Sequence, residues 1–131
     1  MLLDTVALVR LIVGTLSPRA VLGMEAAEVL AVSAVSLFEI NQKVRLGKLA
    51  VPEMGAEAIA ALSAGGVAVA PVSPLAMARA AAMDWRYLAR DHRDPFDRMI
   101  AAAALEMGLP VATSDRAFAG LAGTGLRIID I

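Results

Sequence analysis

Short, continuous apolar runs alternate with longer segments of helical periodicity along this chain. The runs lack the polar residue at every second position that a half-solvated strand carries, which is typical of strands buried on both faces. Strands separated by helices predict a parallel sheet with helices packed on its two faces. We therefore expect an α/β fold with four to five strands, at residues 1–3, 29–32, 67–72, 110–113 and 126–129.

Capping residues indicate where the intervening helices begin and end. The pair Ser17-Pro18 predicts a helix that ends near Glu25. Ser33 can cap another helix, which Gly47 is placed to terminate. The expected helices cover residues 6–16, 18–25, 34–46, 52–63, 74–82 and 95–108, and a short helical turn follows Ser114-Asp115.

The length and composition of the chain indicate how many domains it forms and exclude several classes of site. The 131 residues contain no internal repeat and no linker, so we expect a single domain over residues 1–131. No run approaches the roughly 18 apolar residues that span a bilayer, and the start of the chain lacks the basic region of a signal peptide. Because cysteine is absent, disulfides, zinc–thiolate sites and thiol nucleophiles are excluded. We expect a cytoplasmic protein without a membrane partner.

The net charge and the apolar content indicate which kinds of molecule the chain can bind. The net charge of −1 provides no global basic field, which argues against a passive nucleic-acid-binding module. It does not argue against a metal-dependent nuclease, because bound metal would offset local acidic charge. Hydrophobic residues make up 59% of the chain, so we expect a partner chain to cover some of this surface.

Four acidic residues lie where an apolar run gives way to a helix, or on that helix: Asp4, Glu39, Asp97 and Asp115. The carboxyl ends of parallel strands meet at one edge of a sheet, so we expect these side chains to converge there. Grouped carboxylates repel one another unless a cation is bound. Their oxygen ligands favour Mg²⁺ or Mn²⁺ over Zn²⁺. We expect Asp4 and Asp97 to bind the ion directly, whereas Glu39 and Asp115 orient its water ligands or hold a second ion.

Each acid also has a structural alternative. Asp4, Asp97 and Asp115 could cap helices or stabilise a first helical turn. Glu39 lies in the middle of a helix, where its alternative is an i,i+4 pair with Lys43, worth about 0.3–0.5 kcal/mol on an exposed face. The sequence leaves these alternatives open.

One segment combines basic and aromatic residues that suit contact with phosphates and stacking on bases. The acidic residues Asp84, Asp91, Asp94 and Asp97 are interspersed there, so a solvated loop with local ion pairs is the alternative, and Asp94 is expected to serve as a structural cap. The single histidine, His92, is either a substrate contact or a surface loop residue. The basic and aromatic residues are Trp85, Arg86, Tyr87, Arg90, Arg93 and Arg98.

Five segments in order resemble the PIN-domain ribonucleases, in particular the VapC-type toxins of bacterial toxin–antitoxin pairs. The resemblance implies a three-layer α/β/α sandwich and Mg²⁺-dependent cleavage of RNA. It also implies inhibition by a small antitoxin protein, and assembly into homodimers or toxin–antitoxin hetero-oligomers. The segments are residues 3–5, 32–40, 43–49, 92–101 and 113–118.

The family's metal-site acids correspond to the four residues named above. Thr5 and Ser36 match small polar positions near the family's site, and with Arg93 and Arg98 they are candidate substrate contacts. The chain departs from the pattern at Val6, where relatives commonly carry His or Asn, and at Arg10, where an aromatic residue is frequent. These departures bear on substrate choice and leave the acids intact.

The sequence thus predicts a Mg²⁺-dependent endoribonuclease in which metal-activated water attacks phosphorus and no side-chain nucleophile is needed. Such chemistry does not itself exclude DNA. The alternative is a non-catalytic PIN-like binding or assembly domain. A receiver-like phosphoacceptor domain ranks low, because no lysine follows Lys48. The RNA target, the cleavage position and the identity of the antitoxin are undetermined.

Overall fold

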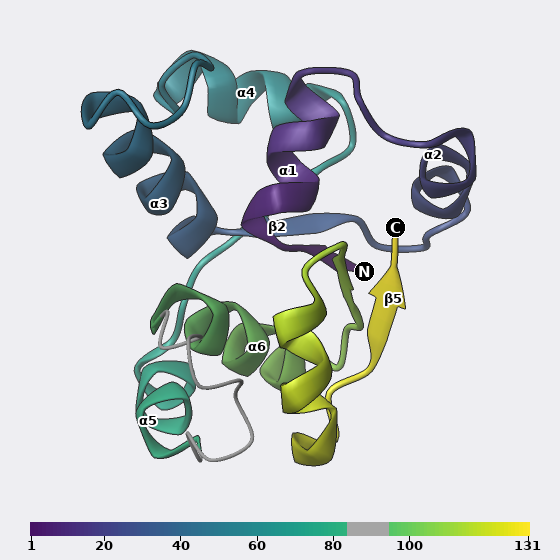
Figure 1. The fold of residues 1–131 in the computed structure, drawn as a ribbon, viewed down its shortest axis with the longest axis vertical. Helices are drawn as coiled ribbons and strands as arrows, with labels where there is room; N and C mark the ends of the chain where they lie inside the picture. Colours follow the sequence, from purple (N-terminus) through teal and green to yellow (C-terminus); the bar gives the residue numbers. More distant parts are fainter. Residues whose placement is uncertain (84–94) are drawn as a thin grey trace.

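The computed structural model describes residues 1–83 and 95–131, and within these ranges the chain forms a five-stranded, wholly parallel sheet (Figure 1). The strand order is β3-β2-β1-β4-β5. This architecture confirms the expected α/β sheet. The strands are β1 (Leu2–Leu3), β2 (Ala31–Ser33), β3 (Ala68–Ala70), β4 (Val111–Thr113) and β5 (Ile128–Asp130).

Helices cover both faces of the sheet, and each face has its own hydrophobic core. Leu2 belongs to the core beneath α5 and α6, whereas Leu3 belongs to the core beneath α1, α3 and α4. Neighbouring residues of a strand point to opposite faces, so a strand of two leucines contributes to both cores. The helices are α1 (Thr5–Ile12), α2 (Pro18–Glu25), α3 (Ala34–Arg45), α4 (Ala56–Ala64), α5 (Pro74–Ala82) and α6 (Pro95–Met107), followed by the 3-10 helix η2 (Arg116–Thr124).

Local capping chemistry agrees with the sequence. The Ser17 side chain accepts a hydrogen bond from the backbone N–H of Ala20 at 3.1 Å, and α2 has the expected bounds. Ser33 caps α3 by accepting from the N–H of Val35 at 3.2 Å. Gly47 follows this helix with a φ of 67°, a conformation that L side chains rarely adopt.

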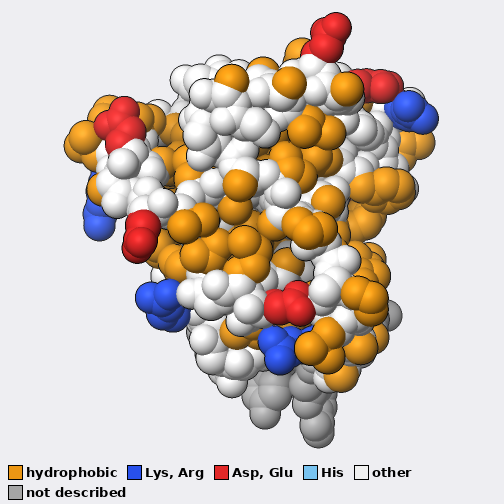
Figure 2. All heavy atoms as spheres, turned by 180° about the vertical axis from the view of Figure 1, so that it is seen from behind, with side chains coloured by type: hydrophobic (Ala, Val, Ile, Leu, Met, Phe, Trp, Pro, Cys, Tyr) orange, Lys and Arg blue, Asp and Glu red, His pale blue; other side chains and the backbone are white. Residues whose placement is uncertain are grey.

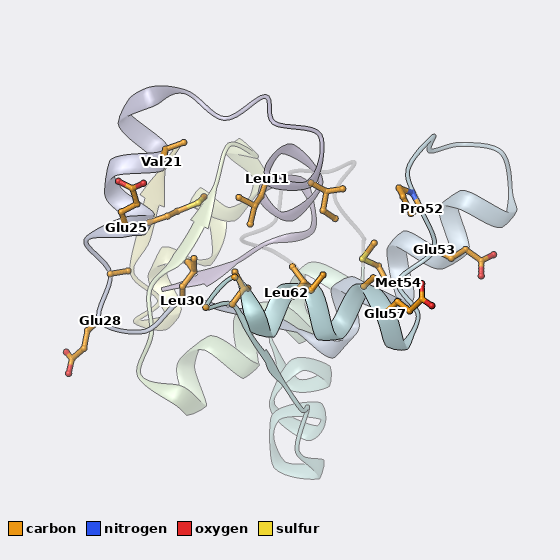
Figure 3. Close-up of a pocket in the computed structure, with 18 residues that line it drawn as sticks. Leu11, Val21, Glu25, Glu28, Leu30, Pro52, Glu53, Met54, Glu57 and Leu62 are labelled. Carbon is orange, nitrogen blue, oxygen red and sulfur yellow. The ribbon is translucent and has the colours of Figure 1, made fainter.

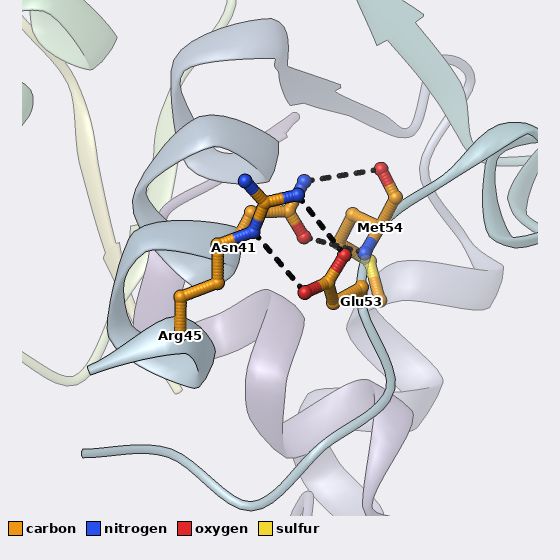
Figure 4. Close-up of polar contacts among 4 residues, drawn as sticks. All are labelled: Asn41, Arg45, Glu53 and Met54. Atoms are coloured by element: carbon orange, nitrogen blue, oxygen red, sulfur yellow. Dashed lines mark hydrogen bonds and ion pairs between the residues drawn. The ribbon is translucent and has the colours of Figure 1, made fainter. Parts of the chain in front are cut away.

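The expected start of the fourth helix at Pro52 is wrong, because α4 begins at Ala56. A long-range contact explains the difference (Figure 4). The N–H of Met54 donates to Asn41 Oδ1 at 2.6 Å, and the carbonyl of Met54 accepts from Asn41 Nδ2 at 3.3 Å. Arg45 also pairs with Glu53, with 3.2 Å between Nε and Oε1. These contacts tie the segment to α3 and use backbone groups that a helix would need.

Strand ends also differ from expectation by one or two residues. The second strand was expected at 29–32 but runs from Ala31 to Ser33, and the last was expected at 126–129 but runs from Ile128 to Asp130. The structure also extends the expected short turn after Asp115 into a nine-residue 3-10 helix. Strand limits follow the register with neighbouring strands, such as Leu2 opposite Ala31, which apolar runs alone do not reveal.

Among residues 1–83 and 95–131, no helix combines the length and apolar character needed to cross a bilayer.

Candidate active site

The strand order reverses its direction between β1 and β4. From β1 the chain builds outward through β2 and β3 on one side, and β4 and β5 complete the other side. Ligands of parallel α/β sheets bind outside the carboxyl ends of the strands at such a point. Asp4 directly follows β1 and Thr113 ends β4, and the register of Leu3 with Ala112 brings these two polar residues side by side.

Asp4 is buried, with 1% of its surface exposed, and both of its carboxylate oxygens accept hydrogen bonds. Oδ1 accepts from the N–H of Ala7 at 2.6 Å, so Asp4 is indeed the cap of α1. Oδ2 accepts from the hydroxyl of Thr113, whose oxygen in turn accepts from the N–H of Asp115 at 2.8 Å. The capping role uses one oxygen, and a carboxylate has further lone pairs for another ligand.

The electrostatics of Asp4 link it to two of the other acids. Burial is the main cause that raises the pKa of Asp4 above its ordinary value, while the hydrogen bonds from Thr113 and Ala7 oppose this shift. The negative charges of Asp115 and Glu39 raise the pKa of Asp4 further. Asp115 and Glu39 therefore both lie close enough to Asp4 for their charges to act on it.

Glu39 lies on α3, where its carboxylate is anchored on both sides. Oε2 accepts from the hydroxyl of Thr5, and Oε1 lies 2.5 Å from the Nζ of Lys43. The i,i+4 pair considered as an alternative is therefore formed, but the Glu39 side chain is only 5% exposed, against 43% for Lys43. The pair joins a buried acid to a half-exposed cation, unlike a solvated surface pair.

The remaining candidates lie at the start of α6 and directly after β4. Asp97 is half-buried in the first turn of α6, and α6 packs against α3. Arg98 is buried beside it. Asp115 is half-buried and its Oδ1 accepts from the N–H of Ala117 at 2.8 Å, which confirms its capping role. The candidates Arg93 and His92, the cap Asp94 and the other basic and aromatic residues at positions 84–90 lie outside the described residues.

The hydroxyl of Ser36 is a further polar group at this end of α3. It is fully buried and has no hydrogen-bond partner within residues 1–83 and 95–131. A buried hydroxyl without a partner is costly, so such groups are frequently satisfied by water or a ligand. Ser36 lies one helical turn before Glu39, which is consistent with the expectation that it serves the site.

The chemistry of these side chains fits a divalent cation that prefers oxygen ligands. No three histidine, aspartate or glutamate side chains in the described ranges approach closely enough to hold an ion among themselves. Magnesium requires fewer, since it commonly takes one or two carboxylates and completes its octahedron with water and substrate oxygens. Asp4, buried beside two other acids, is suited to be one of them.

Thr113 is a site residue that the sequence did not indicate as a candidate in its own right. It orients Asp4 and connects it to the backbone of Asp115, although Asp4 and Thr113 are 109 positions apart. In the sequence, the only indication was the position of Thr113 at the end of an apolar run. This position points to a contact with Asp4 only when β1 and β4 are known to be neighbouring strands.

We expect Thr113→Val to decrease the free energy of unfolding by about 1–3 kcal/mol, because the substitution leaves a buried oxygen of Asp4 and the N–H of Asp115 without their partner. Chemical denaturation of the metal-free protein measures the change. Thr113→Ser retains the hydroxyl and should recover most of the lost stability. Equal stability of the valine and serine variants would contradict this role.

Comparisons with known proteins identify the family and the fold of the chain. The sequence model of the PIN domain matches residues 1–123. No curated protein was found to match the sequence. Solved structures with similar folds include a toxin–antitoxin complex from Klebsiella pneumoniae (18% sequence identity, TM-score 0.62, covering 98% of this chain and 94% of that chain). They also include FitAcB from Neisseria gonorrhoeae (23%, 0.63, 98% and 95%) and VapBC2 from Rickettsia felis bound to a promoter DNA fragment (16%, 0.69, 98% and 96%).

The family match covers nearly the whole chain, and it includes β1, α3, α6 and β4, the elements that carry or adjoin all four candidate acids. The similar structures share the parallel sheet at low sequence identity, which is evidence for the fold. PIN domains are in general nucleases that act with divalent metal ions. The chain therefore belongs to the PIN-domain family.

Proposed function

We propose that the protein is a Mg²⁺-dependent endoribonuclease that hydrolyses RNA phosphodiester bonds and acts as the toxin of a toxin–antitoxin pair. The observation that carries the proposal is the buried Asp4 at the point where the strand order reverses, with Glu39 and Asp115 near enough to raise its pKa. Membership of a family of nucleases supports the same chemistry.

In this proposal Asp4 and Asp97 bind the divalent ion, and Glu39 and Asp115 orient its water ligands or hold a second ion. When bound, the ion supplies a nucleophilic hydroxide near neutral pH and stabilises charge on the phosphoryl oxygens. Thr113 and the N–H of Ala7 fix the orientation of the Asp4 carboxylate. A fixed carboxylate loses little entropy when it binds an ion, which favours a defined position for the attacking water. Manganese would fit the same oxygen ligands.

A long apolar groove supports the proposed protein partner. It has a volume of about 910 Å³ and lies between α1, α2 and α4 (Figure 3). Leu11, Leu30 and Leu62 line its apolar interior. The exposed Glu25 and Glu28 lie at one end of the groove, and the exposed Glu57 lies at the other. An acidic rim around an apolar floor suits an amphipathic helix with basic residues at its edges.

Apolar surface also extends beyond the groove. Figure 2 shows apolar side chains spread over much of one face of the molecule. On α2, Leu22 does not line the groove and is 65% exposed. Apolar surface of this kind marks sites of protein association. Because the similar structures include toxin–antitoxin complexes, we infer a small antitoxin as the partner and a homodimer or toxin–antitoxin hetero-oligomer as the cytoplasmic assembly.

The groove and the candidate site lie at opposite ends of α1. Asp4 caps the start of this helix, whereas Leu11 and Ile12 at its end line the groove. Eight helical residues span about 12 Å. An antitoxin that inhibits cleavage from the groove would therefore have to extend toward the carboxyl ends of the strands.

A non-catalytic PIN-like binding domain is the second candidate. It is favoured by one observation, that the described residues contain no group of three metal-binding side chains at short range. Calorimetric titration with Mn²⁺ separates the two candidates, because a scaffold has no reason to bind the ion at Asp4.

The proposed function is tested by incubating the purified protein with labelled single-stranded RNA and DNA of the same sequence. We expect cleavage of RNA with Mg²⁺ or Mn²⁺ and none with EDTA, because the four carboxylates require a cation to act on a phosphodiester. Preferential cleavage of DNA would correct the substrate class. Undiminished RNA cleavage in EDTA would overturn the metal-dependent mechanism.

A further inference from the structure

Phe38 is an exposed aromatic residue on the helix that carries Glu39. The chain has three phenylalanines. Phe118 is 1% exposed and Phe96 is half-buried, whereas Phe38 is 59% exposed. The ring of Phe38 contacts that of Phe96, with 5.9 Å between the ring centroids and an angle of 57° between the ring planes. Because the two rings are tilted, Phe96 supports Phe38 without lying flat over it.

This aromatic pair lies at the edge of the sheet where the candidate acids are found. Helix α3 begins directly after β2, so Phe38 lies in its second turn, close to the carboxyl end of that strand. The contact with Phe96 brings the first turn of α6 to the same place. Phe38 immediately precedes the buried Glu39. Likewise, Phe96 immediately precedes Asp97. A nucleic acid strand bound at the acids would therefore pass beside Phe38.

The structural alternative is that the pair serves only to pack α3 against α6. Such a role would favour a buried ring, because the stabilisation is proportional to the apolar area removed from water. More than half of Phe38 remains exposed instead. A flat apolar surface beside a group of carboxylates suits a ligand that has an apolar planar part and a phosphate. An unpaired nucleotide has both of these parts, since its base offers a free π face.

We infer that Phe38 is a base-stacking residue of the site, which packs its ring against an unpaired base of the bound RNA. The inference rests on the proposed function and adds a substrate contact to it. Stacking on an aromatic ring tolerates any sequence, because every base has a π face. Phe96 supports the ring from α6, so less side-chain freedom is lost when the base binds. A contact of this kind selects single-stranded RNA, because the bases of a continuous duplex are already stacked on one another.

RNA that lacks a single base tests the inference. A fluorescein-labelled RNA of about 12 nucleotides, and versions with one abasic position each, are titrated with the protein in Ca²⁺ and followed by anisotropy. Gel electrophoresis of the same samples verifies that the RNA stays intact. Phe38→Ala should weaken binding of the complete RNA by about tenfold, with an unchanged slope of log K against log salt, because no charge is removed. Removal of the stacked base should weaken binding by the unaltered protein similarly and add little to the loss in Phe38→Ala.

Two further variants separate stacking from packing. Phe38→Trp keeps an aromatic face and should retain the affinity. Phe38→Leu keeps an apolar side chain without that face and should bind RNA like Phe38→Ala. Leu46→Ala is the matched control, because Leu46 is 61% exposed at the other end of α3 and the substitution also removes a large apolar side chain. This control should leave RNA binding unchanged.

Each outcome bears on the inference separately from the proposed function. Undiminished binding by Phe38→Ala or by Phe38→Leu would overturn the stacking role and leave the nuclease proposal standing. If Phe38→Ala keeps its RNA affinity per protomer but changes the sedimentation of the protein, Phe38 belongs to an interface between copies of the chain, and the inference is again overturned. If the unaltered protein neither binds nor cleaves RNA, both the inference and the proposed function fail.

Discussion

Asp4→Asn should decrease the rate of RNA cleavage by about 10³-fold or more, because it removes the charge of the carboxylate proposed to bind the ion directly. The amide keeps the shape of the side chain. Its oxygen can still accept from the N–H of Ala7, and its nitrogen can donate to Thr113. The loss therefore reflects charge, and it is measured as single-turnover cleavage with Mg²⁺ in excess.

The same substitution should leave the metal-free protein as stable as before, or more stable. Since burial raises the pKa of Asp4, the folded state binds this proton more tightly than the unfolded chain does. The stability contributed by protonated Asp4 is complete below the unfolded pKa of about 3.9 and is lost as the pH rises through the higher folded value. Near neutral pH in EDTA, the charged carboxylate of Asp4 destabilises the folded state because it is buried, and a neutral asparagine does not. The melting temperature of the variant minus that of the unaltered protein should therefore increase from low to neutral pH.

Asp130→Asn is the matched control for Asp4→Asn, because Asp130 is exposed on β5 at the edge of the sheet. The control should keep both cleavage and its pH dependence. Retained Mg²⁺-dependent cleavage by the Asp4 variant would contradict its role as a ligand. A fall in its metal-free melting temperature at neutral pH would instead show that the capping role of Asp4 outweighs the cost of its burial.

Ala61→Arg should weaken binding of the protein partner by about a hundredfold while cleavage by the free enzyme stays unchanged. Ala61 is exposed on α4 and lines the groove, so a long charged side chain there would occupy the space proposed for an antitoxin helix. It would also oppose a partner with basic edges. Arginine has a high helix propensity, so α4 itself should persist. Calorimetry measures the affinity, with the candidate antitoxin being a small protein from a neighbouring reading frame, if one is encoded there.

Ala60→Arg is the control for the groove, since Ala60 is also exposed on α4 but does not line the groove. This variant should bind the partner like the unaltered protein. Equal weakening by both substitutions would indicate a general charge effect. Full affinity of Ala61→Arg would exclude the groove as the docking surface and leave the nuclease proposal unaffected.

Local chemistry explains why much of the fold could be predicted. Ser17, Ser33 and Ser73 precede their helices and accept from backbone N–H groups within three residues, so their role depends on neighbouring residues alone. Glycines such as Gly47 and Gly66 end helices because they adopt positive φ without a steric penalty. The unbroken apolar runs likewise indicated strands buried on both faces, and hence a parallel sheet.

Contacts between distant segments of the chain could not be predicted from neighbouring residues in this way. The contact of Asn41 with Met54 delays the start of α4, although Pro52 and Glu53 suit a helix start. A side chain that captures a backbone N–H across 13 positions outweighs local propensity, because a buried N–H without a partner is costly.

For the site, the acids and their strand-to-helix positions were apparent from the chain, together with the resemblance to PIN-domain proteins. The arrangement of the four acids around one ion stays a prediction, as does the role of Ser36 and Arg98. Tertiary structure alone decided that Asp4 meets Thr113, because that contact requires β1 and β4 to be neighbours. It also decided that Glu39 is buried against Thr5 while Lys43 remains half-exposed. Caps and apolar runs depend on adjacent residues, whereas burial and the pairing of charges depend on which strands and helices come together in space.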